Sequence, residues 1–147
     1  MLHDAHFSWV CCGAGYEIVD RSDYSKQVYN EGDGWAKMPV ESNLNSYNAL
    51  MGHIGQYWST AQSQKWVEET VTTIDGVYYT FDSDGIHWRY LFSEGEITST
   101  SVNNDEVSIK AVIPWYFWYN EDKRIDDDFT ATLVYENGKW VVQELSI

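Results

Sequence analysis

The chain has 147 residues and a formal net charge of -14 at pH 7, because 23 acidic residues outnumber nine basic ones. This length suits one domain, and we expect a single domain that is monomeric. The excess of acids excludes nucleic acid phosphates as the expected ligand and favours a basic protein partner. Polar residues and glycines interrupt every apolar run before the roughly 18 residues of a membrane helix, so no membrane span is predicted.

Aromatic residues are frequent, with eight Trp, eleven Tyr and five Phe, although the hydrophobic content of 44% is ordinary. One small core does not need this many large rings, so we expect some of them at the surface. Together with the negative charge, they favour a recognition function over catalysis.

The first residues predict a short helix over residues 4–12. Phe7, Val10 and Cys11 lie at helical spacing, and two glycines in residues 13–15 end the pattern. Residues 16–33 are polar and irregular, which predicts loops with at most a hairpin. The chain does not begin with the basic and apolar segments of a signal peptide, so either a cytoplasmic protein or a mature exported form remains open.

Cys11 and Cys12 are adjacent and are the two cysteines of the chain. A disulfide between neighbours is strained and closes almost no loop, so both are predicted to be reduced, with intermolecular pairing open to an exported protein. His3 and His6 lie one helical turn apart nearby. They would form a metal site only if the helix aligned all four side chains, and we predict no metal and no cofactor.

A helix-turn-helix pair is predicted in the middle of the chain, after a brief extended segment at residues 35–39. A helix over residues 46–58 follows from apolar residues at helical spacing, namely Leu44, Tyr47, Leu50, Met51, Ile54, Tyr57 and Trp58. A shorter helix continues to residue 69. The candidate N-caps are Asn45 or Ser46 for the first helix and Ser59 or Thr60 for the second.

From residue 71 onward the apolar residues alternate, as in strands. The predicted strands cover residues 71–74, 77–81, 86–92, 97–102, 107–113, 129–135 and 139–145. Asp75-Gly76 and Asn137-Gly138 are tight hairpin turns, and Pro114 is expected to end or bend its strand. The predicted class is α+β, with two or three N-terminal helices packed on a curved antiparallel sheet of about five to six strands, one face of the 107–113 strand being buried against the helices.

Five consecutive rings, Trp115 to Tyr119, precede a predicted loop at residues 120–128 that holds five acids and two bases. In an extended run, Trp115, Phe117 and Tyr119 would be buried and Tyr116 and Trp118 exposed. The exposed rings could line a groove, where aromatic residues supply much of the interface energy. The acids could bind a Lys- or Arg-rich surface, and they are Glu121, Asp122, Asp126, Asp127 and Asp128. The alternative is a solvated loop that keeps the protein soluble.

Asp82 and Asp84 are further binding candidates, in a turn that contains Gly85. Their spacing is a fragment of a calcium loop, but position 12 counted from Asp82 is Ser93 and the Glu is one residue later. A turn is therefore favoured over a calcium site.

The order of these features resembles the bacterial cell-wall DL-endopeptidase inhibitor (IseA-like) family over roughly residues 35–145. The features are the Gly-Trp extended segment, Leu44 before the capped helix, Ser59 before the second helix, the Ile74-Asp75-Gly76 hairpin, the Asp84-Gly85 turn and the Tyr135-Glu136-Asn137-Gly138-Lys139-Trp140 strand pair. The resemblance implies an extracellular or cell-envelope protein without catalytic activity that inhibits or modulates peptidoglycan hydrolases. The ring cluster at residues 115–119 and the run Asp126 to Asp128 depart from the family pattern.

The closing Asn-Gly-Lys-Trp hairpin is also similar to the end of NTF2-like, cystatin-like domains. That resemblance implies a pocket that binds a small ligand or holds a general acid or base, with His53, His87 or Asp84 as candidates. The sequence contains no nucleophile, metalloprotease or phosphate-loop motif. The sequence therefore favours a protein-binding domain that acts through an acidic, aromatic-rich surface, with the pocket domain as the alternative.

Overall fold

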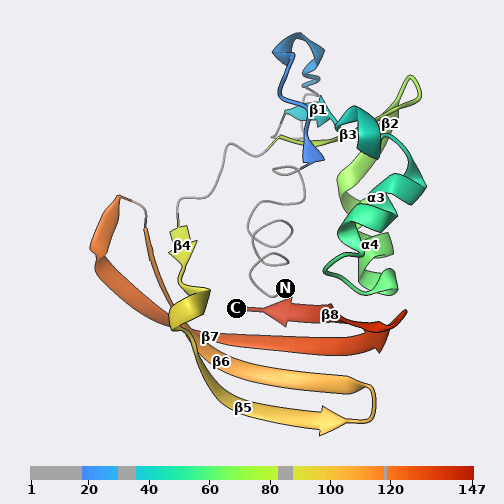
Figure 1. The fold of residues 1–147 in the computed structure, drawn as a ribbon. Coiled ribbons are helices and arrows are strands. Elements are labelled where there is room, and N and C mark those ends of the chain that lie inside the picture. The colour runs from blue at the N-terminus through green and yellow to red at the C-terminus, as the bar shows by residue number, and fades with distance from the viewer. Residues whose placement is uncertain (1–17, 30–35, 83–87, 118) are drawn as a thin grey trace.

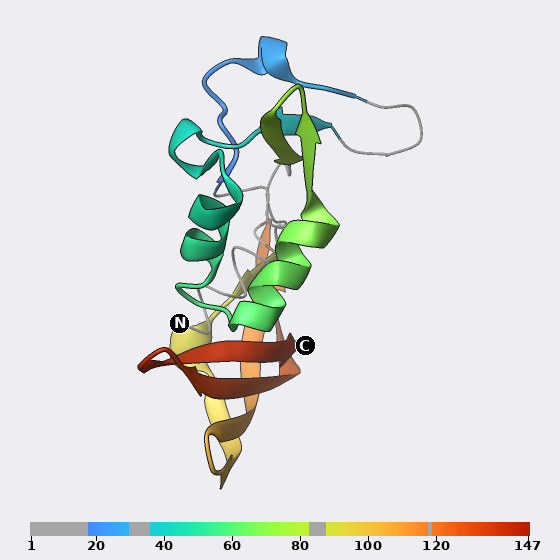
Figure 2. The same cartoon turned by 90° about the vertical axis from the view of Figure 1, so that its right-hand side faces the viewer.

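The computed structural model describes residues 18–29, 36–82, 88–117 and 119–147, except for the side chain of Trp88. This part of the chain contains two α-helices, a three-stranded sheet and a five-stranded sheet, and the helices lie between the two sheets (Figures 1 and 2). The class is α+β, as predicted. The predicted helix at residues 4–12 lies outside the described residues, and so do Cys11, Cys12, His3 and His6.

The two helices are α3 (Tyr47–Ile54) and α4 (Thr60–Thr70), and each begins at a predicted cap. Ser46 Oγ accepts a hydrogen bond from the Ala49 amide and Ser59 Oγ accepts one from the Gln62 amide, both at 3.2 Å. Each bond pairs an amide that the first helical turn leaves open. The first helix is shorter than predicted, since it ends at Ile54.

The small sheet has the strand order β1-β3-β2 and joins β1 (Lys37–Pro39) to the hairpin of β2 (Val71–Ile74) and β3 (Val77–Phe81). The hairpin turn is Asp75-Gly76, as predicted, with φ values of 50° and 80°. Positive φ at both central residues fits the twist of two antiparallel strands, and Asp and Gly tolerate it.

The larger sheet is antiparallel and curled. It contains β4 (Trp88–Tyr90), β5 (Glu96–Asn103), β6 (Glu106–Phe117), β7 (Asn120–Glu136) and β8 (Lys139–Ser146), in the order β4-β6-β7-β8. Both β4 and β5 pair with β6, one after the other along its outer edge. In Figures 1 and 2 the helices lie above β8, and β5 is the strand farthest from them. Short 3₁₀ turns complete the described elements at Tyr24–Lys26 (η2), Ser42–Leu44 (η3) and Phe92–Glu94 (η4).

The helices pack on β8, not on β6 as predicted. A cluster of buried residues joins both helices to the small sheet and to β8, and its members are Ile18, Val40, Leu44, Leu50, Ile54, Trp58, Val67 and Val142. A smaller cluster on β6 and β7 contains Ala111, Ile113, Phe129 and Ala131, and the described side chains packed on it are Tyr90, Phe92 and Leu145. The buried face of β6 is therefore covered by the β4–η4 segment.

The position of the helices also differs from the prediction. Among the described residues α3 and α4 are the α-helices, and they lie between β1 and β2 in the sequence instead of before the sheet. The larger sheet is C-terminal to both. No helix in the described part of the chain is long and apolar enough to cross a membrane.

Pro114 does not end β6, which continues to Phe117. The Leu91 amide donates a hydrogen bond to the Pro114 carbonyl oxygen at 2.8 Å, so the backbone groups of Pro114 face the outer edge of β6. At this point β5 has ended its pairing at Val112 and β4 begins at Trp115. The missing N–H of Pro114 therefore costs no ladder hydrogen bond.

The predicted loop at residues 120–128 is instead the first half of β7, which runs from Asn120 to Glu136. The sequence did not reveal this half of the strand because residues 121–126 are exposed on both faces of the sheet. The polar and apolar residues therefore do not alternate as they do in a strand with one buried face. The turn that follows, Asn137-Gly138, is confirmed, with φ values of 52° and 81°.

Candidate binding surface on the curled sheet

Six rings follow one another along one face of the larger sheet, and we call them the aromatic row. In order they are Phe129, Phe92, Tyr90, Trp115, Phe117 and Tyr119. Their successive centroids lie 5.5, 6.2, 6.1, 5.0 and 5.3 Å apart. These distances are typical of favourable ring pairs, and the Trp115–Phe117 pair is edge-on while Phe117 and Tyr119 are stacked.

Exposure rises along the aromatic row. Phe129 is buried, Trp115 and Phe117 are partly buried, and Tyr119 is 66% exposed. The alternation of β6 places Trp115 and Phe117 on one face, as predicted. Tyr119 was expected to be buried and is not, because it lies just past the end of β6, in the turn that joins β6 to β7. Tyr116 points to the opposite face and is partly buried, and Trp118 lies outside the described residues.

Asp127 brings a carboxylate to the face of the aromatic row. It lies opposite Ile113, two pairs away from Trp115 and Ile125 and therefore on the same face. The Tyr90 hydroxyl donates a hydrogen bond to Asp127 Oδ2 at 3.1 Å. Tyr90 therefore fixes one carboxylate oxygen beside the Trp115 ring and leaves Oδ1 for another donor.

Trp115 lies between two other rings of this surface, Tyr90 and Phe117. Its indole Nε1 is buried and has no hydrogen-bond partner among the described residues. An indole nitrogen is a donor only, and leaving it unpaired costs free energy. Contacts with two neighbouring rings, tilted with Tyr90 and edge-on with Phe117, offset part of that cost.

The other two aspartates of the run lie on the opposite face. Asp126 pairs with Pro114 and Asp128 with Val112, and both are exposed. The predicted cluster Asp126 to Asp128 is therefore divided by the strand, one carboxylate on the face of the aromatic row and two on the reverse. Successive side chains of a strand point to opposite faces, so no continuous triplet exists.

Glu121 and Asp122 lie exposed at the start of β7, close to the turn that carries Tyr119. They are followed by Lys123 and by Arg124, whose Nη1 pairs with Glu94 Oε2 at 2.6 Å. This ion pair joins β7 to η4 and neutralises part of the charge. Glu121 and Asp122 follow Tyr119 by two and three residues, so both carboxylates belong to the exposed end of the aromatic row.

Asp82 does not belong to this surface. It follows β3 in the small sheet, and its Oδ1 lies 3.0 Å from Arg21 Nη2. This binding candidate therefore lies at the small sheet, whereas Asp126 to Asp128 lie on the larger one. Asp84 and His87 lie outside the described residues. No group of three or more metal-ligating side chains occurs in the described segments.

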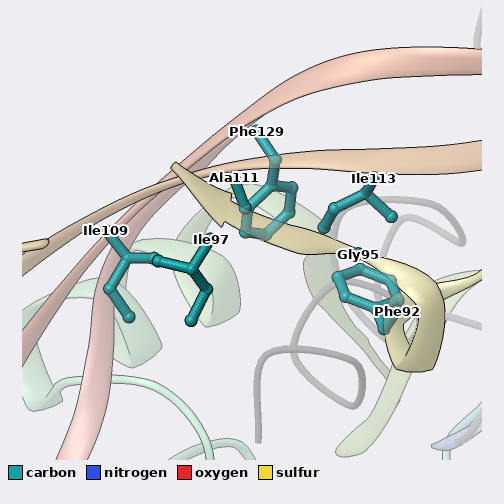
Figure 3. A pocket seen from close by; sticks show the side chains of 7 residues that line it. All are labelled: Phe92, Gly95, Ile97, Ile109, Ala111, Ile113 and Phe129. Carbon is teal, nitrogen blue, oxygen red and sulfur yellow. The ribbon is translucent and has the colours of Figure 1, made fainter. Parts of the chain in front are cut away.

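Two hollows bear on the alternative that the protein binds a small ligand in a pocket. One, of about 240 Å³, is apolar and lies on β5, β6 and η4 (Figure 3). The other, of about 400 Å³, lies between α4 and β8 and is lined mainly by polar side chains with Trp58 and Trp66. His53 lines neither hollow, although its Nε2 is buried without a hydrogen-bond partner in the described part of the chain.

Sequence analysis missed three members of the aromatic row, Tyr90, Phe92 and Phe129. All three were predicted to lie in strands and were given no binding role. For Phe92 the strand prediction over residues 86–92 is wrong, because β4 ends at Tyr90 and Phe92 begins η4. For Phe129 the sequence did contain an indication, because it lies two residues after Asp127 and side chains two residues apart in a strand share a face. The row depends on β4 pairing with the end of β6, which no local pattern predicts.

The fold and the surface define an α+β domain with an exposed aromatic and acidic surface on a curled sheet. The chain matches the model of the IseA DL-endopeptidase inhibitor family over residues 14–146. It therefore belongs to this family, which confirms the resemblance inferred from the sequence. The NTF2-like resemblance receives no support from this match.

The chain was also compared with curated proteins and with solved structures. The search of curated proteins returned no match. Among solved structures, a SEC-C motif containing protein from Rhodopseudomonas palustris is similar at 8% identity and a TM-score of 0.35. The alignment covers 68% of this chain and 64% of the other, so it spans less than two thirds of that protein.

Proposed function

We propose that this protein binds and inhibits a peptidoglycan-cleaving DL-endopeptidase at the cell envelope, without turnover, through the aromatic row and Asp127. Membership of the inhibitor family supports the class of partner. The observation that carries the proposed surface is the Tyr90 hydroxyl held 3.1 Å from Asp127 Oδ2 beside Trp115.

This arrangement suits a basic side chain. A Lys or Arg group attracts both the carboxylate and the face of an aromatic ring, and the attraction strengthens where water is partly excluded. Asp127 is partly buried, whereas Asp126 and Asp128 are exposed on the reverse face. We therefore assign contact with the partner to Asp127 and a longer-range steering role to the other two.

Tyr119 supplies the apolar part of the contact. It is 66% exposed and stacked on Phe117 with an angle of 20° between the ring planes. A ring already stacked on its neighbour loses little conformational freedom on binding, which favours affinity. Glu121 and Asp122, near the same turn, would add negative potential at the rim.

The test is an inhibition assay with a purified DL-endopeptidase catalytic domain and isolated peptidoglycan, together with a direct binding measurement. Asp127→Asn is expected to weaken binding and inhibition about tenfold, since it removes the charge but keeps the shape. The matched control is Asp128→Asn, which removes the same charge one residue further on the reverse face and is expected to change affinity much less.

Salt provides a second measurement. A contact between a carboxylate and a cation weakens as ionic strength rises, and the association rate falls with it. We expect the wild-type complex to lose affinity between low and elevated salt, and the Asp127→Asn complex to respond less. Equal inhibition by wild type and Asp127→Asn at every salt concentration would exclude this surface, and no binding by wild type to any such enzyme would exclude the function.

A further inference from the structure

In the part of the chain that the structure describes, no strand pairs with the outer edge of β5. β5 pairs there with β6, all eight of its residues are exposed, and it is the outermost strand of the sheet in Figures 1 and 2. Open edges present unpaired N–H and C=O groups, and natural proteins usually protect them with Lys, Pro or an inward charge. Residues 96–103 contain no Lys and no Pro, and Glu96 is their one charge.

Two backbone hydrogen bonds fix which backbone groups of β6 face each neighbouring strand. The Tyr135 amide donates to Asp105 O across the β6–β7 side, and the Leu91 amide donates to Pro114 O on the opposite side. The backbone N–H and C=O groups of odd-numbered β6 residues therefore point toward β7, and those of even-numbered residues point toward β4 and β5.

The register of β5 follows from this alternation. Ser99 lies opposite Lys110 and Ser101 opposite Ser108, so both serines direct their backbone groups toward β6. Thr100 and Val102 alternate with them and direct theirs to the open edge. A single irregularity lies between Ile97 and Ser99, which leaves the stretch after it regular.

The same edge carries exposed apolar side chains beside a hollow. Ile97 and Val102 are 63% and 70% exposed. Ile97 and Ile109 lie next to each other at one end of the apolar hollow of about 240 Å³ (Figure 3). An added strand would therefore gain backbone hydrogen bonds from the edge and a place for an apolar side chain from the hollow.

The charges around β5 indicate what kind of strand it accepts. Exposed carboxylates flank it at both ends, Glu96 at the start and Asp105 and Glu106 just past the finish. Lys110 is the one base within β5 and β6, and it lies on the opposite face from Ile109. A second copy would bring like charges together at both ends of an antiparallel pair, and each copy carries a net charge of -14.

We propose that β5 is a strand-addition site for an extended segment of a partner protein, with β-branched or apolar residues in the middle and basic residues at both ends. The site uses a different part of β6 from the aromatic row and does not depend on the proposed function. β6 residues 106–112 border it, whereas Trp115 and Phe117 belong to the row.

The test uses a capped heptapeptide of alternating Thr and Val with Lys at both ends, titrated into the full ¹⁵N-labelled protein. Amide shifts are expected to change in residues 96–103 and not around Tyr119. Thr100→Pro removes one outward N–H without breaking a β5–β6 bond and is expected to weaken binding about tenfold or more. Thr100→Val keeps that N–H and is expected to bind like wild type.

Changes in the peptide give a test that does not depend on how the variant folds. A peptide N-methylated at its Val residues, and one with Glu in place of Lys at both ends, are both expected to bind at least about tenfold more weakly. No binding of the parent peptide, equal binding of the N-methylated peptide, or shifts confined to other strands would overturn the proposal. Concentration-dependent broadening of β5 signals without peptide would assign the edge to a second copy instead and overturn it too.

Discussion

Two parts of this molecule use the same kinds of apolar residue for different purposes. Next to α3 and α4, β8 and the small sheet contribute completely buried side chains, such as Val142 and Met38. Beyond the helices the larger sheet continues through β6 to β5, where Ile97 and Val102 stay exposed and the aromatic row reaches the surface at Tyr119. The first part stabilises the fold, and the second leaves rings, carboxylates and a strand edge accessible.

Leu145 connects the two parts. It packs against the helix-covered cluster and also against the smaller cluster of Ala111, Ile113 and Phe129. The exposed part of the sheet is thus held by its continuity with the covered part and by the packing of Tyr90 and Phe92. The exposed side chains of the larger sheet can therefore serve binding, because other residues supply the stability.

The largest expected effect comes from the covered part. Leu50 is completely buried in α3, so Leu50→Ala should lower the free energy of unfolding by about 2–5 kcal/mol through lost burial and a cavity. Val102→Ala, on exposed β5, should change it by about 0.5 kcal/mol or less. Chemical denaturation of both variants measures the difference, and similar losses would contradict the division into two parts.

A change at the end of the aromatic row should affect binding instead of stability. Tyr119→Ala is expected to weaken binding to the DL-endopeptidase about tenfold, since exposed rings of this kind contribute strongly to interfaces. Tyr29→Ala is a close control, because Tyr29 is 67% exposed and Tyr119 66% exposed. Affinities from titration calorimetry compare the two, and a loss with Tyr29→Ala of equal size would show that the location of the ring does not matter.

A smaller effect is expected where the β7–β8 hairpin meets the helices. Glu136 Oε2 accepts hydrogen bonds from the Thr60 amide at 2.9 Å and from its hydroxyl at 3.0 Å, at the start of α4. Removing this second cap with Glu136→Ala should cost about 0.5–2 kcal/mol. Glu144→Ala removes an equal charge from exposed β8 and should cost less, which thermal unfolding of both variants can test.

Much of the fold was predictable because local signals were strong. Each helix cap, Ser46 and Ser59, was one of two predicted candidates, and the turns Asp75-Gly76 and Asn137-Gly138 were predicted from residue types that suit positive φ values. The alternation in residues 107–113 located β6 as well. These features depend on neighbours within a few residues, which a sequence displays directly.

The site was less predictable because it depends on pairing between distant strands. Asp127 was identified as acidic, but its separation from Asp126 and Asp128 required the strand over residues 120–136, which the charges concealed. Tyr90 and Phe92 joined the site only through the pairing of β4 with β6. The Glu136 contact with Thr60 likewise links residues 76 positions apart, and no local pattern indicates it.

The smallest expected effect tests a surface turn in the first part. Hydrogen bonds from the Ser25 hydroxyl and amide lower the pKa of Asp23 below its ordinary value of 3.8. A carboxyl whose folded pKa is lowered contributes stability above its unfolded pKa and loses that contribution as the pH falls through the folded pKa. Local loosening of η2 is therefore expected only below pH 3.8. Titration of the Asp23 carboxyl by NMR should give a midpoint below that value in wild type, and Ser25→Ala should raise it; a midpoint unchanged by Ser25→Ala would show that the hydroxyl bond does not hold the turn.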